Sequence, residues 1–471
     1  SRFQDIDVTR WREDSVLDNY GNFVYLRDIE SGEFWSNSYQ PVRKKSKNYE
    51  SVFSQSWVEF KRTDNNVDTH TKIAVSPEDD VELRRITITN RSRGKRIIEV
   101  TSYSEIVLNQ PAADIAHKSF GNLFIETEIV KSYQAILARR RSRSEKDAFP
   151  MLLHLMAVHG NTVVGASYET DRNKFIGRCR NISDPAAMHS SNALTDSEGA
   201  VIDPVFAIRS RIELQQDESA TVDYVTGVCD SNDSARALME KYRDRNLADR
   251  VFDLAWTHGQ VGLHQINATE ADAQLFDRLS TSIIYPNPGW RANQSLIRQN
   301  NRGQRDLWGY GISGDLPIVL VRIENQENLE LVGKMVQAHS YWRMKGLKAD
   351  LVIWNEDSSV YRDEMSERIN GLISVNTELK SNRDGGIFLK RSDQMPEEDR
   401  ILFQTAARVI ISDKSGSLSE QLEYIKHPKI TVEPFAASKK PEQAEPMPDY
   451  GMRSDLVCFN GVGAVSYTHL T

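Results

Sequence analysis

The stretch Leu307-Trp-Gly-Tyr-Gly-Ile-Ser-Gly-Asp-Leu-Pro-Ile-Val-Leu-Val-Arg-Ile323 decides how the second half of this 471-residue chain folds. Gly309, Gly311 and Gly314 form the G-x-G-x-x-G pattern of a dinucleotide-binding loop, which requires a strand before the glycines and a helix after them. Here the glycines are followed by the apolar run at residues 318–323, which is typical of a buried strand. The pattern therefore predicts an aromatic, glycine-bearing turn that leads into a strand, and not a nucleotide site.

Strands and helices alternate after this turn. We expect strands at residues 318–323, 350–354, 387–390 and 409–412, and helices at residues 327–344, 360–373, 397–405 and 418–425. Alternation at this spacing predicts a small, mostly parallel α/β layer. Trp342 continues the apolar stripe of its helix, so we expect it in the core.

The first half of the chain has a different pattern, in which short apolar alternations are separated by Gly, Asn, Asp and Ser turns. Residues 83–90 and 95–108 predict a long antiparallel hairpin around the turn at residues 90–94. Further strands are expected at residues 22–28, 56–62, 69–76, 123–130, 152–159, 162–169, 207–214 and 220–229. This number of strands predicts stacked antiparallel sheets.

Between the two halves the hydrophobic period becomes helical. A capping cluster at residues 231–234 precedes helices expected at residues 235–242, 247–264 and 271–284. The predicted organisation is a β-sandwich region at 1–230, a helical linker at 231–285, an α/β segment at 286–430, a Pro- and Ala-rich linker at 431–456, the first strand of a second sandwich at 457–465 and a non-native tail at 466–471. The fold class is thus multidomain, β-rich plus α/β.

Composition excludes several classes of protein. A net charge of -8 argues against nucleic-acid binding, which needs a basic surface. Three cysteines are too few for a disulfide framework, which favours a reducing compartment. No apolar run is long enough to predict a membrane-spanning helix. The chain has neither a signal peptide nor an initiator Met, so we expect it to be a piece of a longer polypeptide.

Motifs for nucleophilic and metal chemistry are missing from the sequence. G-x-S-x-G and H-E-x-x-H do not occur, and the ten histidines are dispersed. His154 and His159 lie at odd spacing on one expected strand, so they should face opposite sides of it. The residues therefore predict no metal site, no cofactor and no identifiable catalytic residue.

Two aromatic clusters are candidates for sugar binding, because aromatic faces and planar polar groups orient sugar rings. The candidate carbohydrate-binding residues are Trp11, Arg12, Asp14, Trp35, Trp308, Tyr310 and Asp315. A second possibility follows from the rule that ligands bind open α/β sheets at the carboxyl ends of the strands. That rule points to Asn325, Asn355, Glu356, Arg391 and Asp393.

Several collinear stretches resemble a known family. They include DVTRWREDSVLDNYGNFVYLRDIESGEFWSNSYQPV (residues 7–42), GAVIDPVFAIRSRIEL (199–214), LWGYGISGDLPIVLVRI (307–323) and HSYWRMKGLKADLVIWNE (339–356). Together they resemble the cyclic β-1,2-glucan synthases, whose C-terminal half belongs to glycoside hydrolase family 94, formerly glycosyltransferase family 36. The resemblance runs over about residues 3–463.

This resemblance implies a large β-super-sandwich followed by a helical linker. It implies a parent that polymerises glucose from UDP-glucose and trims the product with inorganic phosphate, on the cytoplasmic side of a bacterial inner membrane. The family's catalytic acid lies on an (α/α)₆ barrel, for which no segment here has the helical pattern. The implied partners are β-1,2-glucan, the barrel and the second sandwich, with no cofactor in this chain.

Three alternatives remain open from the sequence. The parent could be a soluble β-1,2-oligoglucan phosphorylase instead of a synthase. The chain could also be a structural or interaction module without sugar binding, because sandwich folds host many functions. A nucleotide-dependent enzyme built on the α/β segment is disfavoured, since no phosphate loop opens any of its helices.

Overall fold

The computed structural model describes residues 1–12, 14, 16–142, 149–160, 163–357, 362–376 and 385–424. All of these belong to the first of two compact units, which ends at Ile425. The predicted linker at 431–456, the start of a second sandwich at 457–465, the tail at 466–471 and Cys458 lie outside the described residues.

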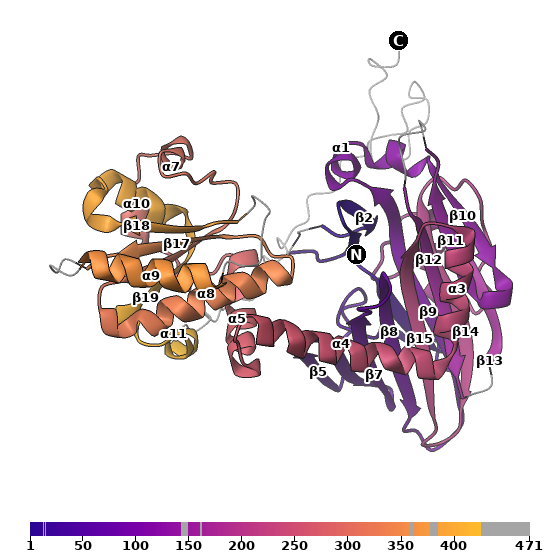
Figure 1. The fold of residues 1–471 in the computed structure, drawn as a ribbon. Coiled ribbons are helices and arrows are strands. Elements are labelled where there is room, and N and C mark those ends of the chain that lie inside the picture. Colours follow the sequence, from indigo (N-terminus) through magenta and orange to yellow (C-terminus); the bar gives the residue numbers. More distant parts are fainter. Residues whose placement is uncertain are drawn as a thin grey trace, which may run out of the picture. The chain divides into compact units, whose positions relative to one another are not determined.

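The first half consists of two large antiparallel sheets (Figure 1). The seven-stranded sheet contains β1 (Arg2–Phe3), β2 (Ile6–Thr9), β3 (Phe23–Asp28), β4 (Phe34–Ser36), β9 (Arg96–Asn109), β13 (Val163–Asp171) and β14 (Pro204–Leu214). The eight-stranded sheet contains β5 (Asn48–Phe53), β6 (Trp57–Asp64), β7 (Val67–Val75), β8 (Val81–Asn90), β10 (Ile125–Val130), β11 (Ala135–Arg140), β12 (Met151–His159) and β15 (Ser219–Cys229). The predicted stacked antiparallel sheets are confirmed.

The predicted hairpin of residues 83–108 is wrong in its pairing. Both strands form, but β8 pairs with β7 and β15, whereas β9 pairs with β14, β2 and β3. The turn therefore carries the chain from one sheet to the other. Ile88 and Ile98 then belong to the same fully buried core cluster between the sheets. Burial of both apolar faces explains this arrangement, because a paired hairpin would leave them on one side of a single sheet.

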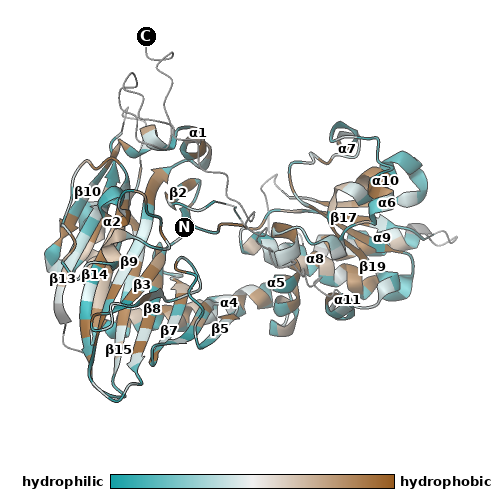
Figure 2. Ribbon diagram, turned by 180° about the vertical axis from the view of Figure 1, so that it is seen from behind, coloured by the Kyte–Doolittle hydropathy of each residue, from teal (hydrophilic) through white to brown (hydrophobic). Residues whose placement is uncertain are grey.

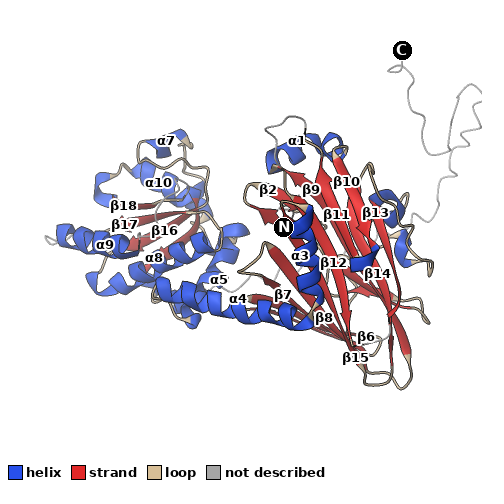
Figure 3. Cartoon of the chain, turned by 45° about the vertical axis from the view of Figure 1, so that its right-hand side comes forward, coloured by secondary structure: helices blue, strands red, loops and turns tan. Residues whose placement is uncertain are grey.

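Helices cover the outer face of the eight-stranded sheet (Figure 3). They are α3 (Asn232–Arg243) and α4 (Arg245–Gln265), whose buried faces pack on residues of β7, β8, β12 and β15. Ser231 caps α3 and Thr269 caps α5 (Glu270–Ile284), each in a reciprocal capping box. The three helices predicted for this region are thus present. Helix α1 (Pro111–Asn122) and strand β5 are elements that the sequence pattern did not predict.

The second half is a four-stranded parallel sheet. Its strands are β16 (Ile318–Ile323), β17 (Asp350–Asn355), β18 (Ile387–Arg391) and β19 (Ala407–Ser412), and its helices are α8 (Leu329–Met344), α9 (Arg362–Asn376), α10 (Glu397–Ala406) and α11 (Leu418–Tyr424). The spatial order is β18-β17-β16-β19. Every pair is parallel, which confirms the predicted α/β layer and makes its sheet fully parallel.

Alternate residues of β16 pack on opposite faces of this sheet. Val319 and Val321 join a cluster with residues of α5, α8, α9 and α11, and Ile318 and Leu320 join a cluster with residues of α10. Both faces are apolar, as expected for a parallel sheet covered on two sides. Figure 2 shows the central strands in brown. Trp342 is 1% exposed, so its predicted place in the core is confirmed.

Candidate functional site

The first predicted sugar-binding cluster surrounds a buried ionic network. Arg10, which is 1% exposed, donates hydrogen bonds to Glu105 of β9 and to Asp114 of α1. Arg12 also donates to Asp114. Trp11 lies between these two arginines in sequence and is 49% exposed. The network fixes the backbone beneath Trp11, and the ring of Trp11 remains accessible.

The charges of this network are matched to one another. Burial alone would raise the pKa of Glu105, but the positive charges of Lys118, Arg10 and Arg172 lower it below its ordinary value. The pKa of Asp114 is lowered in the same way, since hydrogen bonds from Arg10 outweigh burial. Both carboxylates are therefore ionised ion-pair partners, which suits a structural role and not that of a proton donor.

Two other predicted residues of this cluster have structural roles. Trp35 is fully buried in the core between the sheets, which leaves no ring face for a sugar, so its prediction as a sugar-binding residue is wrong. Asp14 accepts hydrogen bonds from the backbone N–H groups of Val16 and Leu17, both at 3.0 Å. Its carboxylate closes a turn, as Asp commonly does.

The second predicted cluster is the turn before β16, and its glycines precede a strand as the sequence predicted. Trp308, the last residue of α7 (Arg305–Trp308), is 58% exposed. Its indole N–H donates to the Ser313 carbonyl oxygen at 3.1 Å, which fixes the ring plane. Gly311 and Gly314 adopt positive φ angles of 77° and 75°, which the tight turn requires. The result is an exposed aromatic face held in one orientation.

The polar neighbours of Trp308 differ in their availability. Asp315 is exposed and accepts one hydrogen bond, from the Gln304 side-chain amide at 2.9 Å. Tyr310 is half-buried and donates its hydroxyl to Asp399 at 2.7 Å. Burial and this hydrogen bond raise the pKa of Tyr310 to about 12. Asp315 and Gln304 are thus exposed like Trp308, whereas the Tyr310 hydroxyl is engaged by Asp399.

The carboxyl edge of the parallel sheet is the place where an α/β layer would bind a ligand. The chain reverses direction across this sheet between β16 and β19, which defines the switch point. Asp413, directly after β19, occupies it. Its carboxylate accepts the backbone N–H groups of Glu324 and Asn325, at 3.0 and 2.9 Å. These two amides, which face the switch point and could otherwise hold an anion, already hold a carboxylate of the same chain.

The other predicted residues at this edge also have protein partners. Glu356 forms an ion pair with Arg322 at 2.9 Å, and Arg391 forms one with Asp393 at 2.8 Å. Asn355 is 3% exposed. Among the residues that the structure describes at this edge, the rule therefore identifies no open ligand site, and the Trp308 turn is the accessible candidate of this region.

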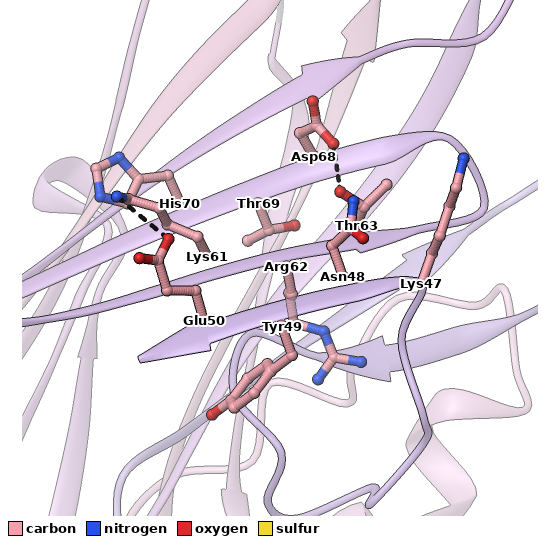
Figure 4. A pocket seen from close by; sticks show the side chains of 10 residues that line it. All are labelled: Lys47, Asn48, Tyr49, Glu50, Lys61, Arg62, Thr63, Asp68, Thr69 and His70. Atoms are coloured by element: carbon pink, nitrogen blue, oxygen red, sulfur yellow. Dashed lines mark hydrogen bonds and ion pairs between the residues drawn. The ribbon is translucent and has the colours of Figure 1, made fainter. Parts of the chain in front are cut away.

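A polar groove on the eight-stranded sheet was not predicted (Figure 4). It lies over β5, β6 and β7 and has a volume of about 600 Å³. Its lining residues are Lys47, Asn48, Tyr49, Glu50, Lys61, Arg62, Thr63, Asp68, Thr69 and His70. Residues of β5 are exposed on both faces, so the strand lacks the alternation that would have revealed it.

Metal and thiol chemistry find no support among the residues that the structure describes. No group of His, Cys, Asp and Glu side chains within those ranges is arranged to hold a metal ion. Cys179 and Cys229 are free thiols, and burial raises the pKa of Cys229 to about 11, which makes it unreactive. Across the same residues, no helix is long and apolar enough to cross a membrane.

Two large antiparallel sheets, with helices α3 and α4 packed on the outer face of one of them, define the class of fold of the first half of the chain. The family model for the glycosyl hydrolase 94 supersandwich domain matches residues 1–245. That match covers more than half of the sequence, and the chain belongs to this family.

Individual relatives divide into two groups by extent. The cyclic beta-(1,2)-glucan synthase NdvB of Rhizobium meliloti (strain 1021) is 29% identical over 425 residues, which is 90% of this chain and 15% of that protein. The solabiose phosphorylase of Paenibacillus borealis is 26% identical over 48% of this chain and 28% of its own. The N,N'-diacetylchitobiose phosphorylase of Vibrio proteolyticus is 25% identical over 53% of this chain and 30% of its own. The chain thus spans less than a third of each of these relatives.

Proposed function

We propose that this chain is a glucan-holding, non-catalytic region of a cyclic β-1,2-glucan synthase-like enzyme. One observation carries the proposal: the similarity to the glucan synthase extends over 425 residues, whereas the phosphorylase similarities extend over 230 and 253 residues. An alignment of 425 residues must include much of the α/β layer as well as the sandwich. This favours a synthase parent over the soluble β-1,2-oligoglucan phosphorylase.

The Trp308 turn supports the sugar-holding part of the proposal. Its indole N–H is bound to Ser313, so the accessible group is the ring face, which packs against the C–H face of a neutral sugar. Asp315 and Gln304 add hydrogen-bonding groups on the exposed side of the same turn. Trp11 and Arg12 offer a second, similar pairing of ring and planar cation on the sandwich.

The remaining roles follow from the parent. The chain would scaffold a catalytic barrel and a second sandwich on the cytoplasmic side of the membrane, and the parent would use UDP-glucose and inorganic phosphate. Asp413 occupies the backbone amides of Glu324 and Asn325 at the carboxyl edge of the α/β layer, which argues against nucleotide binding by this chain. UDP-glucose should therefore bind elsewhere in the parent.

Calorimetric titration of the purified chain tests the proposal. Linear β-1,2-glucooligosaccharides are expected to bind, whereas β-1,4-linked glucooligosaccharides and UDP-glucose are not. No binding of the β-1,2-linked ligand by a folded, monodisperse sample would contradict the glucan-holding role and favour a purely structural module. Binding of UDP-glucose would contradict the assignment of the α/β layer.

A further inference from the structure

We infer that the groove over β5, β6 and β7 is a binding site for a segment of neutral oligosaccharide, distinct from the Trp308 turn. The inference rests on the proposed function for the class of ligand. The site itself is argued from the register, charge pairing and exposure of the groove's own side chains. With about 600 Å³, the groove lies within the range of about 300–1,000 Å³ that ligand pockets occupy.

Strand register arranges the polar side chains of the groove in two rows. Asn48, Thr63 and Asp68 lie opposite one another on β5, β6 and β7. Glu50, Lys61 and His70 form the next row on the same face, two residues further along each strand. Two residues of strand separate the rows by about 7 Å. Figure 4 shows both rows across the three strands.

The charges of these rows are neutralised within the protein. The Lys61 ammonium lies 3.6 Å from the Glu50 carboxylate. Asp68 accepts the Thr63 hydroxyl at 2.7 Å and the Arg91 guanidinium at 2.9 Å. Apart from the Lys47 ammonium, which also lines the groove, a charged ligand would therefore meet groups of both signs that already have partners. Sugar hydroxyls both donate and accept hydrogen bonds, so a neutral sugar can join this network without displacing an ion pair.

The edge strand also presents groups that have no hydrogen-bond partner among the described residues. The Asn48 side-chain amide and the Tyr49 hydroxyl are such groups, and both residues are exposed. Tyr49 lies on the other face of β5, where its ring centre is 5.9 Å from the Arg62 guanidinium carbon. Arg62 is held in turn by Asp64 at 2.6 Å. On the face of the two polar rows, the unengaged group is therefore the Asn48 amide, which can both donate to and accept from sugar hydroxyls.

The opposite end of the groove is closed by packing. Lys72 of β7 lies 3.5 Å from the centre of the Trp57 ring and 4.7 Å from that of Phe252 on α4. These cation–π contacts fill the sheet surface where α4 covers it. The open part of the face is thus limited to the two polar rows, which favours a short segment of glycan over an extended protein partner.

The test compares a groove variant with a matched control on the opposite edge of the same sheet. Asn48→Ala combined with Glu50→Gln removes two groups of the groove from exposed positions of β5. Glu126→Gln is the control, because Glu126 is an exposed carboxylate of edge strand β10, paired with Arg141 at 3.3 Å. Neither change should alter thermal unfolding by more than a small amount, since both sites are on the surface.

The expected result is about a tenfold loss of affinity for β-1,2-glucooligosaccharide in the groove variant and none in the control. Hydrogen exchange of β5 should also slow in the presence of the glucan. Unchanged affinity and unchanged β5 exchange, with glucan still bound by the chain, would overturn the inference and leave the proposed function standing. If the unsubstituted chain binds no glucan, both the proposed function and the inference on the groove are rejected. Preference for an anionic polysaccharide would overturn the neutral class of ligand.

Discussion

One buried carboxylate in the super-sandwich and one in the α/β layer bind different kinds of partner. In the sandwich, Glu99 is fully buried and lies within 3.9 Å of Arg27, 3.3 Å of Arg209 and 3.0 Å of Arg211. In the α/β layer, Asp413 instead accepts two backbone N–H groups.

The consequence of this difference is a difference in accessible surface. Side-chain ion pairs within the sandwich pin loops to its outer face, as when Arg27 and Arg209 donate to the carbonyl oxygens of Ser190 and Asn192, at 2.7 and 3.1 Å. The polar groove of the sandwich lies on the other sheet, over β5, β6 and β7. In the α/β layer, Asp413 binds two backbone amides at the carboxyl edge, whereas the exposed Trp308 precedes β16.

The largest expected effect comes from breaking the sandwich network. Glu99→Ala should lower the free energy of unfolding by about 3–5 kcal/mol, because three guanidinium groups would lose their buried counter-charge. Burial and the neighbouring arginines already lower the pKa of Arg209 to about 10. Urea unfolding measures the change.

The control for Glu99→Ala is Glu126→Ala, which removes an exposed carboxylate from β10 and should cost less than about 0.5 kcal/mol. Similar losses in both variants would mean that burial of Glu99 does not set its contribution. The comparison between the two regions would then lose its energetic basis.

Acidification should distinguish the two regions next. Burial lowers the pKa of His154, in the sandwich, to about 3, and that of His339, in α8, to about 4. Both are neutral in the folded chain, and the unfolded chain takes up their protons as the pH falls below about 6.5. Each histidine should therefore cost about 1.4 kcal/mol of stability per pH unit below that value, until its folded pKa is reached.

The measurement is unfolding between pH 6.5 and 5, before most carboxylates titrate, with hydrogen exchange used to follow each region separately. His154→Gln should flatten the pH dependence of the sandwich, and His339→Gln that of the α/β layer. An unchanged slope in either variant would show that its histidine is not the group taking up the proton.

Removal of the α/β cap should have a moderate effect. Asp413→Ala leaves the N–H groups of Glu324 and Asn325 without their acceptor and should cost about 2 kcal/mol. Asp315→Ala, at the exposed turn, is the control and should cost less than about 0.5 kcal/mol. If Asp413 occupies amides that can bind an anion, its removal frees them. Added sulfate should then raise the melting temperature of Asp413→Ala more than that of the unsubstituted chain. Equal responses to sulfate would reject that description of the edge.

The sequence predicted the α/β layer well because its periodicity is local. Each strand of residues 318–412 is an apolar run, and each helix has its own stripe, so no long-range information is needed. The pairing of β8 and β9 could not be derived in this way. A turn between two amphipathic strands is compatible with a hairpin or with a crossing between sheets, and only the core packing decides.

For the candidate site residues too, local sequence patterns were informative and long-range packing could not be predicted. The exposure of Trp308 could be predicted, because it lies on a glycine-bearing turn next to a strand. Trp35 could not be recognised as core, since its short strand β4 has too few residues to show a period. The role of Asp413 was hidden among 67 acidic residues, because its partners are backbone N–H groups that every residue type carries.

The smallest expected effect is on glucan binding, and it compares the α/β layer with the sandwich as the place where glucan binds. Trp308→Ala should weaken β-1,2-glucan binding about tenfold, or about 1.4 kcal/mol, and should leave stability nearly unchanged because the ring is exposed. Trp256 of α4 provides a matched control, since it is 53% exposed against 58% for Trp308. Titration of both variants with β-1,2-glucan distinguishes specific stacking on Trp308 from non-specific contact with any exposed aromatic ring. Equal losses of affinity in the two variants would mean that the contact is non-specific. Unchanged affinity in Trp308→Ala would mean that the glucan binds on the sandwich instead.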